Sequence, residues 1–424
     1  MSTTKEAGST VDAGAKSTAE LAAGEPASPS NRTLLATYAA GLTTNALTLM
    51  MKVVVPLWAL RLEMSPTMIG VAVGAGGLLP FLLSIHGGVL MDRFGTRRVN
   101  VIFAVVATVS VALFPFLPWV SAVIALQLVA GLSSNIGWMG AQALIVQYAP
   151  GNTTAIGRFS MASRLGNLGA PILTGFVWDA VGPIGTFLFV ALWPLLTFVA
   201  LLLVPPTHTD VEGRGRRVGI RDVLPQVSDY LQAFAMIAIP AVAFIVVLTF
   251  VRIASSAIQA SFYVVYLEKI GLSGIVIGTL IGIGEGFGMF GAGVAGWIEK
   301  RLKPHWTLIL FIAISVAAVC VTPYVGGLTV LLVLFSAIRG NAQGLSQPVM
   351  FAILSRAVDP REQGRSIGLR TTANRLATMI IPPAMGIIVD VAGLEASFLW
   401  MGLFLVGICV AVALVVRRLP AFQA

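Results

Sequence analysis

Seven ionisable side chains stand inside long apolar runs of this 424-residue sequence. They are six bases and one acid: Lys52, Arg164, Arg252, Arg339, Arg370, Arg375 and Glu285. A charge at the centre of a lipid bilayer costs about 2.5–3.5 kcal/mol on insertion scales, so such charges face a partner, a ligand or water. The surplus of bases indicates chemistry with a negatively charged group.

Three of these bases belong to polar stripes at helical spacing. Residues three, four, seven or eight positions apart share one face of a helix. The stripes contain Asn45, Thr48 and Lys52; Asn135, Trp138 and Gln142; Arg252, Ser255, Ser256 and Gln259; and Arg339, Gln343, Ser346 and Gln347. A polar stripe on an otherwise apolar helix faces water or a ligand, so the four stripes predict one hydrophilic cavity.

The acid, Glu285, lies in a glycine-dense stretch, Gly282-Ile283-Gly284-Glu285-Gly286. Glycines let neighbouring helices approach closely and exclude water from the carboxylate. This environment suits a proton carrier. The alternative is a fixed counter-ion to Arg252 or Arg339.

The composition indicates that a helical membrane protein positions these residues. The sequence is 57% hydrophobic and only 11% charged, which no soluble core requires. We predict twelve spans, at roughly 33–60, 67–91, 98–117, 119–147, 158–181, 184–204, 235–266, 274–298, 306–323, 326–354, 366–390 and 396–416. Residues 1–31 are polar and predict a disordered tail rather than a signal peptide.

The distribution of Lys and Arg predicts the orientation. Most basic residues fall in the tails and in the loops that would share their side, whereas the opposite turns hold only Arg61 and Lys269. The net charge of +9 is therefore explained by the positive-inside rule rather than by nucleic acid. We expect both termini in the cytoplasm and the protein in the plasma or inner membrane. A cytoplasmic loop at 205–233 would separate bundles at 32–204 and 234–418, and a tail at 419–424 would follow.

The two halves repeat one pattern of residues. Arg164, Leu165, Pro171, Gly175, Asp179, Gly182 and Phe187 recur 211 positions later as Arg375, Leu376, Pro382, Gly386, Asp390, Gly393 and Phe398. Ser65 with Ile69-Gly70 similarly matches Ser273 with Ile277-Gly278. Many secondary transporters are built by internal duplication, with the binding site between the repeats.

A short basic turn joins the second and third spans, and it has the sequence Gly88-Val89-Leu90-Met91-Asp92-Arg93-Phe94-Gly95-Thr96-Arg97-Arg98. This turn resembles the loop signature of the major facilitator superfamily. Together with the repeat, the resemblance implies an all-α fold of two pseudo-symmetric six-helix bundles that work by alternating access. It also implies that spans one, four, seven and ten line a central cavity.

The sequence departs from the family pattern in three places. Glu299-Lys300-Arg301 keeps the acid and the bases of the loop signature without its second glycine. Gln127 stands where the family commonly has an arginine in span four. The glycines around Pro171 only partly resemble the motif of the drug/proton antiporters, so no branch of the family is assigned.

The resemblance implies a gate of ion pairs. Asp92, beside Arg93 and Arg97, would meet the cytoplasmic end of span eleven in the outward-open state and pair with Arg370 or Arg375. By pseudo-symmetry, Glu299 would pair with Arg158 or Arg164. Such pairs break when the cytoplasmic side opens. The alternative for Arg164 and Arg375 is contact with substrate.

The resemblance and the stripes together point to an anionic substrate. Lys52, Arg252 and Arg339 would share one cavity, and three cations repel each other unless an anion joins them. We expect Arg252 and Arg339 to bind a carboxylate or phosphate ester through paired N–H groups, with Lys52 as a point charge. The remaining residues expected to bind substrate are Asn45, Trp138, Gln142, Gln259 and Gln343.

Transport would be coupled to a proton through Glu285, or to exchange with a counter-anion. One alternative is a proton-coupled drug or metabolite efflux pump whose buried bases are structural. Another is a transporter-like sensor that moves nothing.

The sequence lacks the residue patterns that several other classes of function require. There is no Walker loop for ATP. The three histidines are too scattered for a metal triad, and no catalytic arrangement shares a helix face. We therefore expect no enzyme activity, no metal, no cofactor and no nucleic-acid partner. A monomer in the lipid bilayer is expected.

Overall fold

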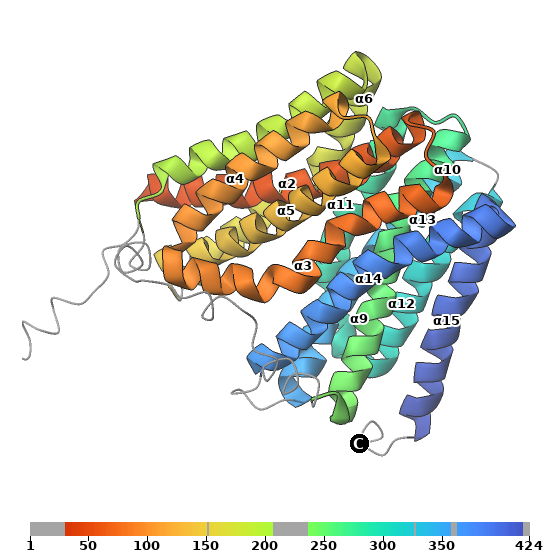
Figure 1. The fold of residues 1–424 in the computed structure, drawn as a ribbon. Helices are drawn as coiled ribbons and strands as arrows, with labels where there is room; N and C mark the ends of the chain where they lie inside the picture. The colour runs from red at the N-terminus through yellow and green to blue at the C-terminus, as the bar shows by residue number, and fades with distance from the viewer. Residues whose placement is uncertain (1–29, 151, 207–235, 326–327, 358–362, 419–424) are drawn as a thin grey trace, which may run out of the picture.

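The structure is a computed structural model that describes residues 30–150, 152–206, 236–325, 328–357 and 363–418. Within these ranges the protein consists of helices joined by short turns (Figure 1). The first half contains α2 (Asn31–Arg61), α3 (Pro66–Phe94), α4 (Thr96–Leu113), α5 (Val120–Tyr148) and α6 (Thr153–Leu203). The second half contains α9 (Pro240–Ile258), a π-helical turn η4 (Gln259–Tyr263), α10 (Val264–Lys269), α11 (Gly274–Glu299), α12 (Pro304–Cys320), α13 (Thr329–Ala357), α14 (Gln363–Ala392) and α15 (Leu394–Arg418).

The described helices account for the twelve predicted crossings. Nine helical stretches are long and apolar enough to cross a membrane, and the stretch from α9 through α10 counts as one of them. The 51-residue α6 supplies two crossings because its backbone breaks at Gly182, whose φ of 71° favours glycine. The break lies between the predicted spans 158–181 and 184–204. The shorter α12 and the polar α13 complete the set.

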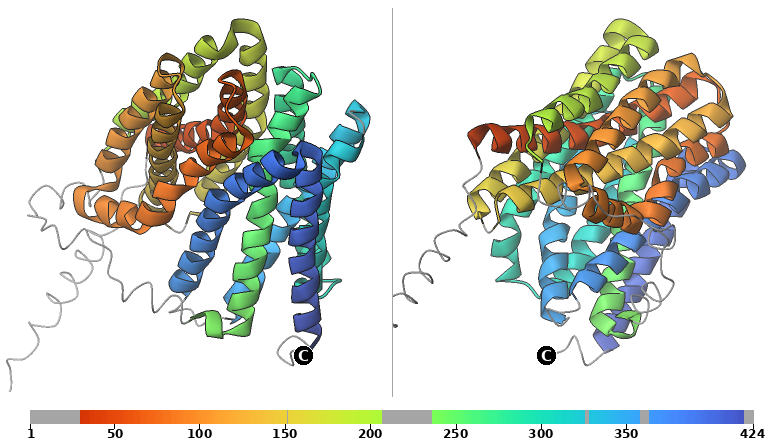
Figure 2. Two further views of the ribbon diagram at one scale, coloured as in Figure 1. Left: turned by 45° about the vertical axis from the view of Figure 1, so that its right-hand side comes forward. Right: turned by 60° about the vertical axis from the view of Figure 1, so that its left-hand side comes forward.

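Each half forms one bundle, and the bundles meet at one side only. We call the side that carries Asn31 and Arg418 the tail side, and the side that carries the turns at 62–65 and 270–273 the far side. The bundles touch at the far side and diverge toward the tail side, which gives the molecule the shape of a V (Figure 1, Figure 2). The structure is therefore open at the tail side.

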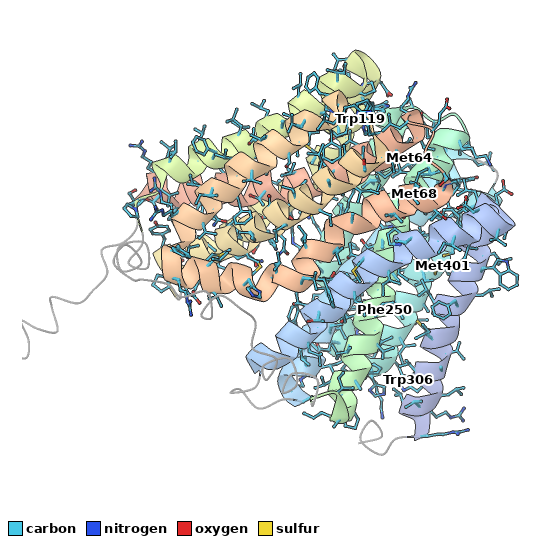
Figure 3. All side chains as sticks on the ribbon, in the orientation of Figure 1. Met64, Met68, Trp119, Phe250, Trp306 and Met401 are labelled. Carbon is cyan, nitrogen blue, oxygen red and sulfur yellow. The ribbon has the colours of Figure 1, made fainter. Side chains whose placement is uncertain are left out.

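The outer surface matches a bilayer. Large apolar side chains are exposed along the outside of α6, α14 and α15. Trp119 lies exposed at the far side and Trp306 at the tail side (Figure 3). Tryptophan is enriched at both surfaces of a membrane, so the two residues mark the expected boundaries.

The boundaries of the predicted domains stay predictions. The tail at 1–31, the loop at 205–233 and the tail at 419–424 lie almost wholly outside the described residues. The bundles at 32–204 and 234–418 correspond to the two groups of helices described above.

Candidate functional site

A central cavity with two lobes lies between the bundles. The lobe nearer the tail side, here the tail lobe, has a volume of about 410 Å³ and is lined by α2, α5, α6, α9, α11 and α13. The lobe nearer the far side, here the far lobe, measures about 300 Å³ and is lined by α2, α3, α5, α9, η4 and α14. Asn45, Trp138, Ile253 and Ser256 belong to the walls of both lobes, so the lobes adjoin.

Basic side chains dominate the wall of this cavity. Arg164, Arg252 and Arg339 line the tail lobe, and Lys52 and Arg375 line the far lobe. Among the described residues that form the two walls, Glu285 is the one acid. No acid of the described chain lies within 4.0 Å of any of these five bases, so the excess positive charge is not neutralised by ion pairs.

Arg252 on α9 is held by Gln343 on α13. The Arg252 Nη1 donates to Gln343 Oε1 at 2.9 Å, and Gln343 Nε2 donates back to the Arg252 carbonyl oxygen at 2.9 Å. The Arg252 side chain is only 9% exposed, and its Nε has no hydrogen-bond partner. The reciprocal pair fixes the guanidinium while leaving it donors that a ligand in the tail lobe can use.

Arg339 on α13 lies directly against α11. A Cβ added at Gly284 would be 2.7 Å from Arg339 Nη2, so the guanidinium occupies the space that this glycine leaves open. Glycines bring the two helices together, since a Cβ at Gly340 would be 1.9 Å from the Gly284 carbonyl oxygen. The close approach predicted for the glycines around Glu285 is therefore confirmed, and it sets this carboxylate beside the buried Arg339.

Lys52 on α2 lines the far lobe and is influenced by charged groups of both lobes. Its ammonium group lies within Coulombic range of Glu285 and Arg339 in the tail lobe, and of Arg375 in the far lobe. The side chain is half-buried because it faces the cavity rather than a packed core. Of the three bases that we expected to share one cavity, Lys52 thus lines the far lobe, and Arg252 and Arg339 line the adjoining tail lobe.

Trp138 gives the cavity an aromatic wall where the lobes meet. Its indole stacks on Phe159, with ring centroids 5.9 Å apart and an interplanar angle of 17°. Asn45 also lines both lobes and donates to the Ser163 carbonyl oxygen at 3.5 Å, and Gln142 lines the tail lobe. Polar and flat apolar surfaces are thus available beside the charges.

Two members of the stripe that begins at Arg252 are not part of either cavity wall. Ser255 is hydrogen bonded to Ser315 on α12 at 3.1 Å. Gln259, the first residue of η4, is buried at 6% exposure and belongs to neither wall. The structure thus differs from the prediction that Gln259 binds substrate. Only part of the polar face of this helix reaches the cavity. That part contains Arg252 and Ser256.

Arg164 and Arg375, which we expected in the gate, line the cavity instead. Arg375 donates to Asn135 Oδ1 across the two bundles. Arg370 stacks over the Phe351 ring, 4.5 Å from its centroid. In this structure, therefore, Arg164 and Arg375 belong to the cavity wall, Arg370 lies against Phe351, and none of the three forms an ion pair with Asp92 or Glu299.

The acids predicted for the gate lie apart from those arginines in this structure. Glu299 forms an ion pair with Arg356 of its own bundle at 2.7 Å, and Arg158 and Arg164 take no part. Asp92 is exposed at the tail end of α3, next to Arg93. The pairs were predicted for the state in which the tail side is closed, so this tail-open structure leaves them untested.

Arg97 has a structural contact that the prediction did not include. Its Nε donates to the Leu201 carbonyl oxygen at 2.9 Å, and its Nη2 donates to the Leu202 carbonyl oxygen at 3.4 Å. Arg97 therefore caps the last turn of α6 within the first bundle, where a cation also complements the helix dipole.

Sequence reasoning missed several polar residues of the cavity. Asn167 lines the tail lobe with its Oδ1 buried and unpartnered, and Asn374 lines the far lobe. Asn167 stands three positions after Arg164 and Asn374 directly before Arg375. Because those two arginines were assigned to the gate, the asparagines near them were not predicted to line the cavity.

Comparison with known proteins agrees with this architecture. The family model of the Major Facilitator Superfamily matches residues 33–335 and 246–423. No curated protein matches the sequence.

Solved structures with the same fold cover nearly the whole chain. A mutant of the nucleoside transporter NupG has a TM-score of 0.75 at 14% identity, covering 90% of this chain and 99% of its own. A POT family transporter bound to a thioalcohol-conjugated peptide has a TM-score of 0.71 at 15% identity, covering 90% and 96%. A bacterial homologue of the human lysosomal transporter Spinster, in an inward-facing and occupied conformation, has a TM-score of 0.68 at 14% identity, covering 92% and 97%.

Two six-helix bundles around a central polar cavity, and a family match over most of the chain, lead to one conclusion: this multi-pass membrane protein belongs to the Major Facilitator Superfamily of transporters.

Proposed function

We propose that this protein is a secondary active transporter that moves a small organic anion, a carboxylate or a phosphate ester, by alternating access. The single observation that carries the proposal is the charge of the cavity wall. Five bases face the two lobes, and Glu285 is the one acid among the described wall residues. An anion in the cavity would relieve the repulsion between these bases.

The geometry of the tail lobe supports Arg252 and Arg339 as the main anion ligands. Both guanidinium groups are buried in the wall of the lobe, where Arg252 is hydrogen bonded to Gln343 and Arg339 lies against the glycine-lined surface of α11. Arginine binds carboxylates and phosphates through paired N–H donors, so two fixed guanidinium groups suit either. A lobe of about 410 Å³ accommodates a small metabolite.

The shape of the molecule supports rocking of one bundle against the other. The bundles touch at the far side and diverge at the tail side, which is one of the two end states that alternating access requires. Most basic residues at the helix ends lie on the tail side, so we assign that side to the cytoplasm and place the protein in the plasma or inner membrane. In this assignment the structure is the inward-open state.

The proposed coupling uses either Glu285 as a proton carrier or exchange against a second anion. Glu285 shares the tail lobe with Arg252 and Arg339, so its charge directly opposes an anion bound there. Protonation of Glu285 would strengthen anion binding, and anion binding would favour protonation.

The test is a ligand-stability screen on the purified protein. Carboxylates and phosphate esters should raise the melting temperature, since a ligand that binds only the folded state stabilises it. In Arg252→Gln and in Arg339→Gln, the shift should disappear and uptake of the same anion should fall by at least about tenfold, because a charged hydrogen-bonded contact is lost. Arg418→Gln, which removes an exposed base at the end of α15, is the matched control and should leave both readouts unchanged.

The second candidate is a drug or metabolite efflux pump coupled to protons, with structural bases in the cavity. The stacked Trp138 and Phe159 favour it, because flat apolar compounds bind to aromatic walls. In the stability screen, this function would appear as stabilisation by lipophilic cations. Retention of all anion transport in both arginine variants would overturn the anion proposal.

A further inference from the structure

Two carboxylates at the far side bind helix ends of the opposite bundle. Asp179, near the far end of the first crossing of α6, accepts a hydrogen bond from the backbone N–H of Gly274 on its Oδ1 at 2.8 Å. Its Oδ2 accepts the N–H of Ile275, also at 2.8 Å. Gly274 and Ile275 are the first two residues of α11, so one side chain of the first bundle caps a helix of the second.

The same arrangement occurs at the pseudo-symmetric place. Asp390, near the far end of α14, accepts the backbone N–H of Thr67 on its Oδ2 at 3.1 Å and the Thr67 hydroxyl on the same oxygen. Thr67 is the second residue of α3, and the first, Pro66, has no N–H to donate. The threonine hydroxyl thus takes the place of the missing backbone donor, and each acid receives two hydrogen bonds.

These contacts satisfy helix ends that have incomplete caps of their own. The first N–H groups of a helix have no partner within the helix, and the helix dipole favours a negative charge there. The N-cap residue of α11, Ser273, makes no side-chain capping bond. Ser65 at the start of α3 accepts from the N–H of Met68 and leaves that of Thr67 to Asp390. The opposite bundle therefore supplies caps that these helices would otherwise take from water.

Backbone contact beside each acid makes the caps sensitive to movement of the bundles. A Cβ at Gly175 would be 1.9 Å from the Gly274 carbonyl oxygen, and one at Gly386 would be 2.5 Å from the Pro66 carbonyl oxygen. Both glycines lie one helical turn before the acid of the same helix. Since the helices touch through backbone, separating the bundles at the far side removes both caps together.

We propose that Asp179 and Asp390 are the positioning residues that hold the far side closed in the tail-open state. They form a symmetric pair of latches, here the far-side latches, between α6 and α11 and between α14 and α3. When the bundles rock to the other state, the N–H groups of Gly274, Ile275 and Thr67 exchange the carboxylates for water. The strength of the latches then sets the balance between the two states of the transporter, whatever its passenger is.

The same helix pairs also carry the predicted tail-side gate. Asp92 lies at the tail end of α3 and Glu299 at the tail end of α11. Each pair of helices thus has an acid at either end, one on each partner. The far-side acids are engaged in this structure, and the tail-side acids would engage when the tail side closes.

The test measures the distance between the bundles at both sides by pulsed electron paramagnetic resonance of spin-labelled cysteine pairs. Trp119→Cys with Val391→Cys reports on the far side, and Thr154→Cys with Leu302→Cys on the tail side, since these residues are exposed and each pair spans the two bundles. The buried Cys320 and Cys409 are first replaced by alanine. Asp179→Ala and Asp390→Ala should each raise the ratio of far-open to far-closed molecules about fivefold, the typical effect of one lost cap, and the double variant should raise it further.

A merely structural role for these acids would give a different result. Release of a latch must lengthen the far-side distance and shorten the tail-side distance in the same molecules, whereas local loosening would lengthen the first alone. Glu395→Ala is the matched control, because Glu395 is an exposed acid at the far end of α15, a helix that packs against helices of its own bundle. Unchanged distances in the folded variants, or far-side loosening alone, would overturn the proposal. The readout needs no passenger, so it can fail or succeed independently of the proposed anion.

Discussion

At the scale of single residues, charged side chains in the cavity wall have fewer partners than those at the ends of the helices. Arg97 donates to carbonyl oxygens at the end of α6, and Glu299 is paired with Arg356, so both are occupied within their own bundles. In the cavity wall, Arg252 donates one hydrogen bond from its Nη1 to Gln343, and its Nε has no partner. A base that is held in place but incompletely satisfied is the kind of group that the proposed anion would satisfy.

Glu285 is the residue for which a single substitution distinguishes two mechanisms. If the passenger travels with a proton carried by Glu285, then Glu285→Gln should abolish accumulation driven by an imposed pH gradient, because glutamine cannot exchange a proton. Exchange of labelled for unlabelled anion should be retained, since the arginines remain. The measurement is uptake into proteoliposomes with and without a pH gradient, compared with exchange at equal pH. Gradient-driven accumulation that persists in Glu285→Gln would assign coupling to a counter-anion.

At the scale of elements, glycines decide how α11 and α13 present the site. Gly284 and Gly340, and one turn further on Gly288 and Gly344, allow backbone contact between the two helices. This contact sets Glu285 on α11 beside Arg339 on α13. The same principle operates at the far side, where Gly70 and Gly278 approach the carbonyl oxygens of Pro382 and Pro171.

We expect Gly340→Ala to separate α11 from α13 and to weaken anion binding. The new Cβ would be 1.9 Å from the Gly284 carbonyl oxygen, a contact that requires the backbones to move. Overpacking of this kind costs about 1–3 kcal/mol of folding stability, which should lower the melting temperature by several degrees.

The matched control is Gly293→Ala on α11, where nothing lies within 4 Å of the added Cβ. It should leave the melting temperature and anion binding near those of the original protein. An unaltered melting temperature in Gly340→Ala would show that the close contact contributes nothing to stability.

At the scale of the whole molecule, the V shape defines which end state the structure represents. Contact between the bundles is concentrated at the far side, where α3 meets α14 and α6 meets α11. The tail-side halves of the same helices diverge (Figure 1). The other state of the cycle requires these tail-side halves to approach each other.

A cross-link across the tail side should therefore form only in molecules that reach the other state. Cysteines introduced by Gly88→Cys on α3 and Thr371→Cys on α14 should react poorly with a short cleavable bifunctional reagent at rest. Addition of the passenger should increase the cross-linked fraction, and cross-linking should stop flux until the reagent is cleaved.

Cysteines at Thr96 and Gln147, which are hydrogen bonded at 3.0 Å within the first bundle, serve as the control. Their cross-link should form at rest and leave flux intact. If the tail-side cross-link forms readily and transport continues, the bundles do not rock as proposed.

Most of the fold was predictable from the sequence, and the cavity only in part. The twelve spans follow from apolar length and turn residues, and the break in α6 follows from Gly182 next to Pro183. Lys52, Trp138, Arg252 and Arg339 were expected to share a cavity because helical periodicity puts each on the polar face of its own helix and the family resemblance places those four helices around the cavity. Ser255 satisfied the same periodicity but is hydrogen bonded to Ser315 on α12, because periodicity alone does not state which neighbour a polar face meets.

By itself the sequence determined the membrane helices, their internal duplication and the excess of buried bases, since these follow from local composition and spacing. Only the tertiary structure decided that Arg164 and Arg375 line the cavity, and that Asp179 and Asp390 cap helices of the opposite bundle. It also decided which side is open. The physical reason is that contacts between helices distant in the chain depend on how the bundles pack, and two packings of one transporter differ by only a few kcal/mol, which no local pattern of residues encodes.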